Sequence, residues 1–408
     1  MPGIRAYNPE RDHDAVKRIW LEVGWLEKEK TQPLDIILEA SHGMVGDVHD
    51  AAECFVITSE AKLRYQDVDL PMAAVTGVTT SRIARKQGLA RHVLARALSR
   101  DVQEGAVLSG LGMFEQGYYN RMGYGTGPYE IWADFDPSTL SVPSPSKPPL
   151  RLSGEDSDRM HACRLKRMRR HGSVNLLHPG LTKADISWAS HGFGLGYEQD
   201  GTLTHFLFCD TKDVEYGPYT VWFSAYQNHT QLLDLLGIIK SLGDQVHSVH
   251  MHEPPGIQMQ DFLKNPFRLR RKTEKGKYAS RIRAHAYFQY RMLNVEACLQ
   301  KTRIPCEPLR FNLSLTDPIG DLLQGEDGWQ GVAGSYIVEL GPQSSAQKGS
   351  DEALPLLSAS VGAFTRMWLG VRPASSLAVS DDLAGDAELL ADLDSAIQLP
   401  LPQTDWDF

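Results

Sequence analysis

A short turn that combines glycine with basic side chains carries the clearest chemical signal in this sequence. The turn, Arg85-Lys86-Gln87-Gly88-Leu89-Ala90, follows the apolar, β-branched run Met72–Thr80 and opens a segment with apolar residues at helical spacing. Gly88 has no Cβ, so a ligand can approach its backbone closely. The first amides of a helix lack acceptors within the helix and lie at its positive end. Together with the charges of Arg85 and Lys86, these amides predict a pyrophosphate site.

The spacing of the turn excludes two common nucleotide sites. The sequence has no G-x-x-x-x-G-K-[ST] motif and no G-x-G-x-x-G opening this helix, so neither a P-loop nor a dinucleotide-binding turn is predicted. Gly192-Phe193-Gly194-Leu195-Gly196 has glycines at a similar spacing, but no helix follows it. We expect a β-hairpin there.

A second motif lies downstream, in the run F-E-Q-G-Y-Y-N-R-M-G-Y-G from Phe114 to Gly125. The order R-x-x-G-x-A after a strand resembles the acetyl-CoA loop of the GNAT N-acetyltransferases. The downstream run resembles the strand, short helix and Gly-aromatic turn that follow this loop in the superfamily. Its Y-x-R-x-G-Y-G core is most similar to the Eis (enhanced intracellular survival) branch. The resemblance covers almost the whole chain, because the C-terminal third also carries features of that branch.

The resemblance implies an enzyme that uses acetyl-CoA as co-substrate, and it assigns the parts of the site. The cofactor would lie against the basic turn and against backbone amides at the end of the preceding strand, which would polarise the thioester carbonyl. The cofactor-binding residues are then Val78, Thr79, Thr80, Arg85, Lys86, Gly88, Leu89 and Ala90. Tyr119 matches the family's general acid, and the terminal carboxylate of Phe408 matches its general base. Without this motif around it, Tyr119 would be interpreted as a core aromatic residue.

Ordinary pKa values constrain both of these roles. A tyrosine with a pKa of about 10 is a weaker acid than a thiol with a pKa of about 8.5, so we expect the helix N-terminus and Arg121 to lower the pKa of Tyr119. A terminal carboxylate with a pKa of about 3.5 is a poor direct proton acceptor from an ammonium with a pKa of about 10. A water relay, or electrostatic holding of the ammonium, is the easier role for Phe408.

The last four residues, Asp405-Trp406-Asp407-Phe408, combine two acids with two bulky aromatics. Most chain ends are disordered, but a free tail gains nothing from Trp and Phe, so we expect this tail to be buried. By resemblance, Asp405 and Asp407 would line a wide acidic substrate pocket, shared between domains, with Trp25 and Glu27. Solvation at the surface is the alternative for the two aspartates.

Composition narrows the class of protein. The chain has 408 residues and a net charge of −9, which disfavours a general nucleic-acid binder and suits a cationic substrate. Its five cysteines are scattered without a C-x-x-C pair, which predicts reduced thiols and no zinc site. The first residues lack a signal-peptide pattern, and no apolar run approaches the roughly 20 residues of a membrane-spanning helix. We expect a cytoplasmic protein with no metal, no nucleic acid and no membrane partner.

The length predicts two or three domains, and the patterns fit mixed α/β and α+β sheets. Residues 1–140 are predicted to form a catalytic GNAT domain. By resemblance, residues 150–288 form a second, degenerate GNAT-like domain and residues 289–408 a sterol-carrier-like α+β domain. Residues 141–149 belong to a Pro/Ser stretch, Asp136–Pro149, that we expect to bury almost nothing. Family members assemble as hexamers, so the resemblance also implies a homo-oligomer.

Local signals place several elements. Asn8 is predicted as a helix N-cap with Pro9 at the first helical position, and Tyr129–Phe135 as the last strand of the first unit. In the second unit, His252-Glu253-Pro254-Pro255-Gly256 stands where a phosphate loop would follow the predicted strand Val246–Met251. Two prolines remove amide donors and Glu253 repels phosphate, so we expect no CoA there.

Two clusters of potential ligands are given a structural interpretation. His250 and His252 share a face of a strand, close to His247, but too few partners stand at metal-ligand spacing, so no metal site is predicted. The basic runs Arg164–Arg170 and Arg268–Lys272 lie in an acidic chain without interleaved aromatics. A solvated face or an oligomer contact is therefore favoured over nucleic-acid binding.

Two classes of function remain. The favoured one is an acetyl-CoA-dependent N-acetyltransferase that transfers an acetyl group directly to amines of a polycationic substrate, aminoglycoside-like or polyamine-like by resemblance. The alternative is a non-catalytic scaffold that binds lipid or a partner and keeps a vestigial acetyltransferase fold. The intact basic turn together with Tyr119 favours the enzyme. The N-myristoyltransferases also pair two such folds with a terminal carboxylate, but the sterol-carrier-like part argues against them.

Overall fold

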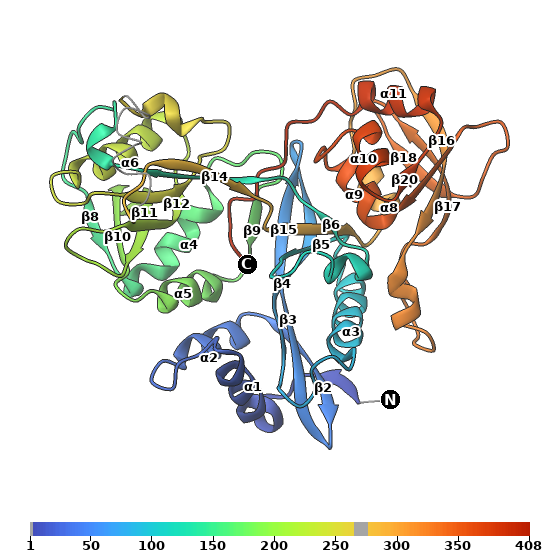
Figure 1. Ribbon diagram of the computed structural model, residues 1–408, viewed down its shortest axis with the longest axis horizontal. Helices are drawn as coiled ribbons and strands as arrows, with labels where there is room; N and C mark the ends of the chain where they lie inside the picture. Colours follow the sequence, from blue (N-terminus) through green and yellow to red (C-terminus); the bar gives the residue numbers. More distant parts are fainter. Residues whose placement is uncertain (1–2, 265–275) are drawn as a thin grey trace.

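The computed structural model describes residues 3–264 and 276–408, and these residues form sheets of eight, seven and five strands. Figure 1 shows three lobes, each built around one sheet, with the C-terminus between the first two. All five cysteines are unpaired. No helix in the described ranges is both long enough and apolar enough to cross a membrane. The basic run Arg268–Lys272 lies outside the described residues.

The first sheet has the order β1-β2-β3-β4-β5-β15-β6, with β9 added to β3. Its strands are β1 (Ile4–Ala6), β2 (His42–Val48), β3 (Ala51–Tyr65), β4 (Val68–Thr80), β5 (Leu108–Gly112), β15 (Phe288–Met292), β6 (Gly125–Thr126) and β9 (Val174–Leu176). Pairing is antiparallel except between β4 and β5, which run parallel. Alternating residues of β3 serve two layers: Phe55 and Ile57 pack in the core that includes Trp20 of α1 (Pro9–Val23), and Cys54 and Val56 in the core under α3 (Leu89–Gln103).

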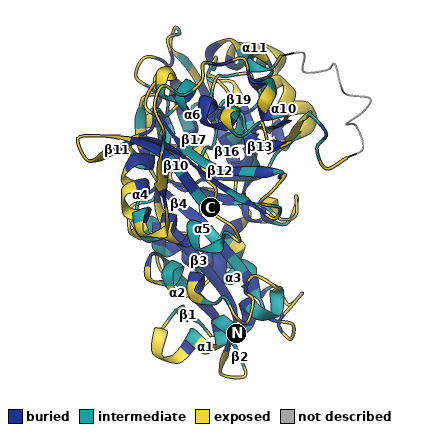
Figure 2. Ribbon diagram, turned by 90° about the vertical axis from the view of Figure 1, so that its left-hand side faces the viewer, coloured by how far each residue is buried: buried dark blue, intermediate teal, exposed yellow. Residues whose placement is uncertain are grey.

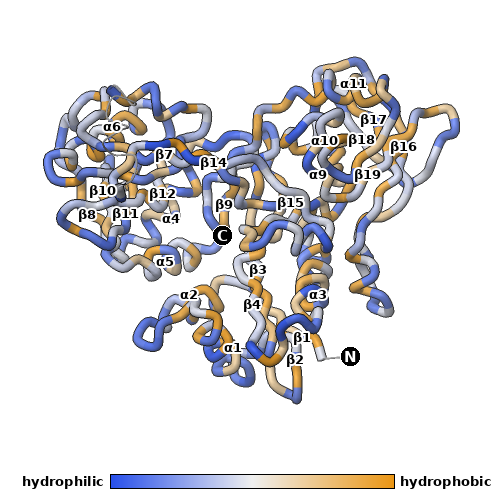
Figure 3. Tube along the Cα trace, viewed as in Figure 1, coloured by the Kyte–Doolittle hydropathy of each residue, from blue (hydrophilic) through white to orange (hydrophobic). Residues whose placement is uncertain are grey.

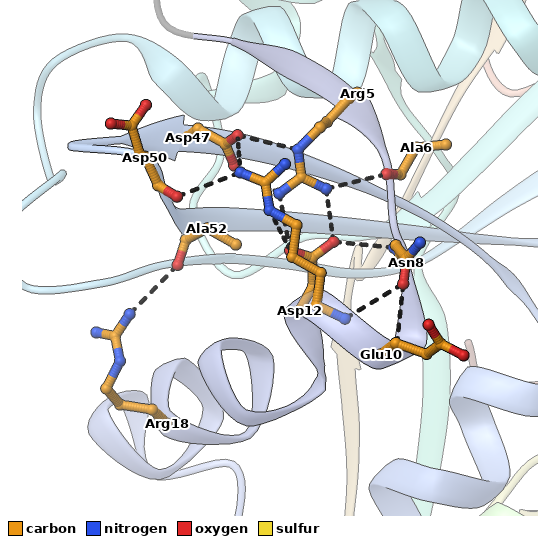
Figure 4. Close-up of polar contacts among 10 residues, drawn as sticks. Arg5, Ala6, Asn8, Glu10, Asp12, Arg18, Asp47, Asp50 and Ala52 are labelled. Atoms are coloured by element: carbon orange, nitrogen blue, oxygen red, sulfur yellow. Dashed lines mark hydrogen bonds and ion pairs between the residues drawn. The ribbon is translucent and has the colours of Figure 1, made fainter.

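The predicted N-cap of α1 is confirmed. The Asn8 side chain accepts hydrogen bonds from the amides of Glu10 and Arg11, and Pro9 occupies the first turn. Figure 4 shows the polar network around this end of the helix, in which Arg5 of β1 bonds to both Asp12 and Asp47. One guanidinium therefore joins the first strand to α1 and to β2.

The second sheet has the order β14-β7-β13-β12-β11-β10-β8. Its strands are β14 (Arg281–His285), β7 (Glu130–Phe135), β13 (Val249–His252), β12 (Tyr219–Ala225), β11 (Thr202–Thr211), β10 (Phe193–Gln199) and β8 (Leu150–Leu152). The helices α4 (Ser157–Leu165), α5 (Pro179–Trp188) and α6 (His229–Ser241) complete this lobe. The hairpin expected around Gly192–Gly196 is confirmed as β10 and β11.

One strand expected in the first unit lies in the second sheet. We predicted Tyr129–Phe135 as the last strand of the first unit, but β7 pairs with β13 and β14. The vacant place in the first sheet is taken by β15, which follows the second lobe in sequence and pairs with both β5 and β6. The prediction was wrong because an apolar run indicates a strand and does not indicate which sheet receives it.

The Pro/Ser stretch between the first two lobes is not a free linker. Leu140 and Val142 are buried, and the Lys240 ammonium of α6 donates to the carbonyl of Val142. Leu140 also forms an isolated bridge with Leu263. The expectation that this stretch buries almost nothing was wrong, because two apolar residues spaced two apart let it pack on the second lobe.

The third sheet has the order β18-β17-β16-β19-β20 and belongs to an α+β lobe, as expected. Its strands are β18 (Ser345–Lys348), β17 (Gly334–Leu340), β16 (Leu309–Thr316), β19 (Leu356–Ser360) and β20 (Leu383–Ala384). The helices are α8 (Val295–Gln300), α9 (Val361–Trp368), α10 (Ala374–Ser380) and α11 (Ala387–Ala396). One apolar core extends from the first sheet through β15 into this lobe, and the Tyr65 and Trp368 rings stack in it at 4.1 Å.

Burial follows the sheets. Strands β3 and β4 are largely buried along their length, while many connecting turns are exposed (Figure 2). Strands such as β3 and β4 carry hydrophobic stretches, and helices such as α3 alternate between hydrophobic and hydrophilic residues along the chain (Figure 3). Hydrophobic burial of this kind supplies the main driving force for folding.

A buried ion pair joins the first and third lobes. Arg291 of β15 donates to Asp317 at 2.7 Å, and neither side chain is exposed. Asp317 also accepts from the amides of Ile319 and Val332, and Arg291 donates to the carbonyl of Met122. The remaining polar atoms of the pair are therefore satisfied, as burial of charges requires.

We expect Asp317→Asn to destabilise the protein by about 3–5 kcal/mol, because it leaves the buried Arg291 charge without a counter-charge. Glu339→Gln is the control: its pair with Arg310 is exposed, and such pairs contribute about 0–1 kcal/mol. Denaturant unfolding followed by circular dichroism measures both. Equal stabilities of the two variants would contradict the assigned role of the buried pair.

Candidate active site

The first feature of the site is an opening between two parallel strands. The β4–β5 pairing extends only from Met72↔Leu108 to Val75↔Leu111. Directly beyond it β4 contains a bulge, since Ile57 of β3 pairs with Gly77 and Thr58 with Val75, which leaves Thr76 unpaired. From there β4 continues against β3 alone. The predicted residues Val78, Thr79 and Thr80 lie in this section, where the β5 side of the strand has no partner.

The basic turn lies at the end of this section of β4 and leads into α3. Gly88 is the N-cap with φ 79°, a left-handed conformation that glycine adopts without steric cost, and Lys86 has φ 61°. Arg85 and Lys86 are exposed, whereas Leu89 is buried and packs in the core. Among the described residues, the amides of Gly88, Leu89 and Ala90 have no hydrogen-bond acceptor. The structure thus presents free amides and two cations at one helix N-terminus.

Tyr119 begins the single-turn helix η1 (Tyr119–Met122) and is 3% exposed. Its ring contacts those of Phe114, Tyr118 and Tyr124 with centroids 5.0–6.2 Å apart. Burial raises the pKa of Tyr119, and the neighbouring Tyr118 adds to the effect. The expected lowering of this pKa is therefore wrong for the unliganded protein: desolvation dominates in an aromatic cluster.

The same desolvation acts on thiols in this core. Cys54 belongs to the same apolar cluster as Tyr119, and burial raises its pKa to about 12. A thiolate leaving group held here would likewise be a stronger base than in water, which offsets the weak acidity of the tyrosine. No hydrogen-bond partner occupies the Tyr119 hydroxyl among the described residues, so that hydroxyl is available to donate.

The glycines of the Y-x-R-x-G-Y-G motif serve packing. Gly123 has φ 80°, and a Cβ there would lie 2.5 Å from the Val361 side chain of α9. A Cβ on Gly125 would collide with the carbonyl of Gly362. The two glycines of the motif are therefore needed for the close packing of this turn against α9 of the third lobe.

The C-terminal tail is anchored, as expected. Trp406 is 2% exposed, and the Arg164 guanidinium lies 3.7 Å from the centre of its ring. Arg167 forms a two-pronged ion pair with Asp405, at 2.6 and 2.8 Å. The interpretation of Arg164–Arg170 as a solvated face was wrong for these two arginines, which are buried and hold the tail.

Asp405 and Asp407 differ in what they can bind. Asp405 also accepts the amide of Val174, so Arg167 and the backbone already satisfy its carboxylate. The expectation that Asp405 collects a cationic amine is corrected for this reason. Asp407 has no such partner among the described residues and faces the cavity described below.

Phe408 packs on β15, the strand that neighbours β5. Its ring packs on Phe288 of β15 at 4.9 Å, and Phe288 is the register partner of Gly112, the last residue of β5. Tyr287 precedes Phe288, and its backbone carbonyl accepts a hydrogen bond from the amide of Met113. The side chain of Tyr287 lies near enough to Tyr119 to contribute to the raised pKa of Tyr119. The last residue thus lies in the neighbourhood of the open strand pair and of Tyr119.

Trp25 and Glu27 lie apart from the tail. Trp25 is 42% exposed, packs edge-on against Trp20 and contacts Gly77 in the β4 bulge region. Glu27 lies in an exposed turn and bridges to Lys30. Neither residue lines the cavity that Asp407 faces. Trp25 is therefore placed near the open end of β4, whereas the structure gives Glu27 no contact with the other candidate residues.

A cavity of about 500 Å³ lies between the second sheet and the tail. It is lined by β7, β12, β13, α4 and residues 401–407, with Trp132, Trp222 and Tyr226 among its walls. Among the lining residues, Glu130, at the start of β7, was not selected from the sequence, whereas His252, at the end of β13, was considered there as a metal ligand and given a structural interpretation. The one available signal for Glu130 was an acid at the start of the otherwise mostly apolar run Tyr129–Phe135, which also contains Asp134.

Comparison with known proteins agrees with this geometry. Residues 51–127 match the family model described as an acetyltransferase (GNAT) domain. No curated protein sequence matches the chain.

Solved structures similar to the full chain have low sequence identity. A protein of unknown function from Enterococcus faecalis V583, described as a probable N-acyltransferase, has TM-score 0.81 and 16% identity, with 100% of both chains covered. A GCN5-related N-acetyltransferase from Anabaena variabilis ATCC 29413 has TM-score 0.77 and 13% identity, and Eis1 from Mycobacterium abscessus has TM-score 0.77 and 14% identity. Both matches also cover 100% of each chain. Residues 51–127 are thus similar in sequence to a GNAT acetyltransferase domain, and the whole chain shares its fold with these solved structures.

Proposed function

We propose that this protein is an acetyl-CoA-dependent N-acetyltransferase that transfers an acetyl group directly to an amine of a polycationic substrate. The observation that carries the proposal is the helix N-terminus at Gly88, with its free amides and two exposed cations, at the end of the unpaired section of β4. A pyrophosphate on this turn leaves the rest of the cofactor to extend along the opening between β4 and β5.

The reaction needs three groups from the chain. Backbone amides in the Val78–Thr80 section would polarise the thioester carbonyl as the amine nitrogen bonds to its carbon. The C–S bond then breaks, and Tyr119 would donate its proton to the departing CoA thiolate. The carboxylate of Phe408 would hold the ammonium or accept its proton through water. The amine attacks directly, so no acetylated residue forms.

The finer assignments rest on the resemblance. It suggests aminoglycoside-like or polyamine-like substrates, a cytoplasmic hexamer, and a sterol-carrier-like role for the third lobe. The acidic balance of the chain and the free Asp407 at the cavity support a cationic substrate. A second CoA site after β13 is disfavoured, because the turn there contains Pro254 and Pro255 and Glu253 accepts the amide of Met259.

We expect Gly88→Asp to abolish CoA binding, because it places a negative charge against the pyrophosphate. Gly88→Asn is the matched control: it has the same size, lacks the charge, and asparagine tolerates the left-handed conformation better than most residues. Isothermal titration of CoA should give one site per chain for the parent and a weakened site for Gly88→Asn. Two sites per chain, or unimpaired binding by Gly88→Asp, would show that the pyrophosphate lies elsewhere.

We expect Tyr119→Phe and a peptide extension after Phe408 to lower kcat about 10²–10⁴-fold, the typical contribution of general acid–base catalysis. Acetyl-CoA affinity should persist in both, because neither change touches the basic turn. Steady-state kinetics and titration calorimetry measure the two quantities, and an equal extension at the N-terminus is the control. Turnover at the parent rate by the C-terminally extended protein would remove Phe408 from the mechanism.

A further inference from the structure

Three side chains from distant parts of the chain converge in the cavity beside the tail. Glu130 comes from β7, His252 from β13 and Asp407 from the tail, and their ligand atoms all lie within 4.8 Å of one another. His252 is held in place by its contact with the Trp132 ring, at 3.6 Å between ring centres. All three residues line the 500 Å³ cavity.

Glu130 lacks the partner that a buried carboxylate normally has. Its side chain is 8% exposed, and its Oε1 atom is buried without a hydrogen-bond partner among the described residues. The nearest basic group is the half-exposed His285 of β14, whose Nε2 lies 3.9 Å from Oε2. Buried polar groups are almost always bonded, so the unpaired carboxyl of a residue that lines a cavity is suited to accept a hydrogen bond from a donor in that cavity.

The charges around the cluster indicate the sign of that ligand. Burial, and next the charge of Asp407, raise the pKa of Glu130 to about 8. Asp407 is exposed on one side, and desolvation by the surrounding tail and next the charge of Asp185 raise its pKa, an effect that Arg164 partly offsets. Burial, and next His250 and His285, lower the pKa of His252 to about 3, so its imidazole is neutral.

Two tyrosines complete the set of titratable groups that face Glu130. Burial raises the pKa of Tyr287, as do the charges of Asp407 and Glu130. The pKa of the buried Tyr290 is raised as well, with Glu130 as one cause. Both hydroxyls stay neutral at physiological pH. The groups that face Glu130 are therefore a carboxyl group, a neutral imidazole and two neutral phenols, and the cation Arg164 acts on the Asp407 side of the cluster.

We propose that Glu130, His252 and Asp407 bind a second ammonium group of the substrate, one that is not acetylated. The inference rests on the proposed function and narrows it to diamines. An ammonium with three acceptors at about 2.8 Å in tetrahedral directions places those acceptors about 4.6 Å apart, which is within the 4.8 Å limit of the cluster.

The location of the cluster explains why two amines are needed. Asp407 faces the cavity of the second lobe, whereas the next residue, Phe408, packs on β15 in the first sheet. If one amine of the substrate lies at the thioester near Phe408, the remainder of the substrate can extend past the tail, so that its second amine reaches the cluster. The walls formed by Trp132, Trp222 and Tyr226 suit an apolar or ring-shaped connector with a cationic end.

Binding of the second ammonium should release a proton. Near pH 7 the free Glu130 is mostly protonated, and an ammonium favours its ionised form, so the pKa falls and close to one proton leaves for each diamine bound. Affinity should rise as pH increases toward about 8. Above about pH 9, where Glu130 is already ionised, no proton is released.

The experiment is isothermal titration of the CoA-bound, full-length protein with hexamethylenediamine, in buffers that differ in ionisation enthalpy. Aminohexanol, which has the same length and one amine, is the matched ligand. We expect proton release with the diamine only, and its loss in Glu130→Gln. Glu155→Gln, an exposed glutamate in another part of the second lobe, is the control and should behave as the parent.

Kinetics provide a second measurement. In Glu130→Gln, the ratio of kcat/KM for the diamine to that for aminohexanol should fall about ten- to a hundredfold, the value of one charged hydrogen bond. If Glu130→Gln leaves this kcat/KM ratio unchanged and the parent releases no proton on binding the diamine, the cluster is not an ammonium site. The acetyltransferase function is tested separately, because turnover of either amine supports it. Zn²⁺ titration distinguishes a metal site. If Glu130→Gln abolishes Zn²⁺ binding and leaves diamine binding unchanged, the ammonium proposal is overturned in favour of a metal site.

Discussion

The chain crosses repeatedly between its first two sheets, and β7, β9 and β15 each lie in the sheet built mainly by the other part of the chain. Strand β7 enters the second sheet between β13 and β14, and β15 returns to the first sheet between β5 and β6. Hydrogen bonds of the two ladders therefore fix the lobes against each other more firmly than surface contact alone. The start of β7 supplies Glu130, and the start of β15 supplies Phe288, which Phe408 contacts. The candidate site exists because these two strands are exchanged.

The tail depends on this frame and on a few charged contacts. Arg164 and Arg167 of the second lobe hold Trp406 and Asp405, and the final residue is thereby directed to the first sheet. Each contact is desolvated, so the pairs act as specific clamps rather than as screened surface bridges. The two acids of the tail therefore have different roles: Asp405 anchors the tail to Arg167, and Asp407 faces the cavity.

Much of the first lobe could be predicted because its signals are local. The Gly88 turn, the Asn8 cap and the strand β4 each depend on residues close in sequence. The exchange of β7 and β15 could not be predicted, since an apolar run looks the same in either sheet. The burial of Arg167 was missed because its partner Asp405 lies more than two hundred residues away. Glu130 and His252 meet only through strand register, which no periodicity reveals.

The place of β15 also determines the order in which the chain can fold. Strand β6 pairs only with β15 among the described strands, and β5 needs β15 on its outer edge. These partners lie more than 150 residues apart in sequence, so the loop that joins them must close against a large loss of chain entropy. During synthesis from the N-terminus, the first sheet keeps an open edge until residue 292 has been made. The first lobe is thus the first to be started and is completed only after the second lobe has been made.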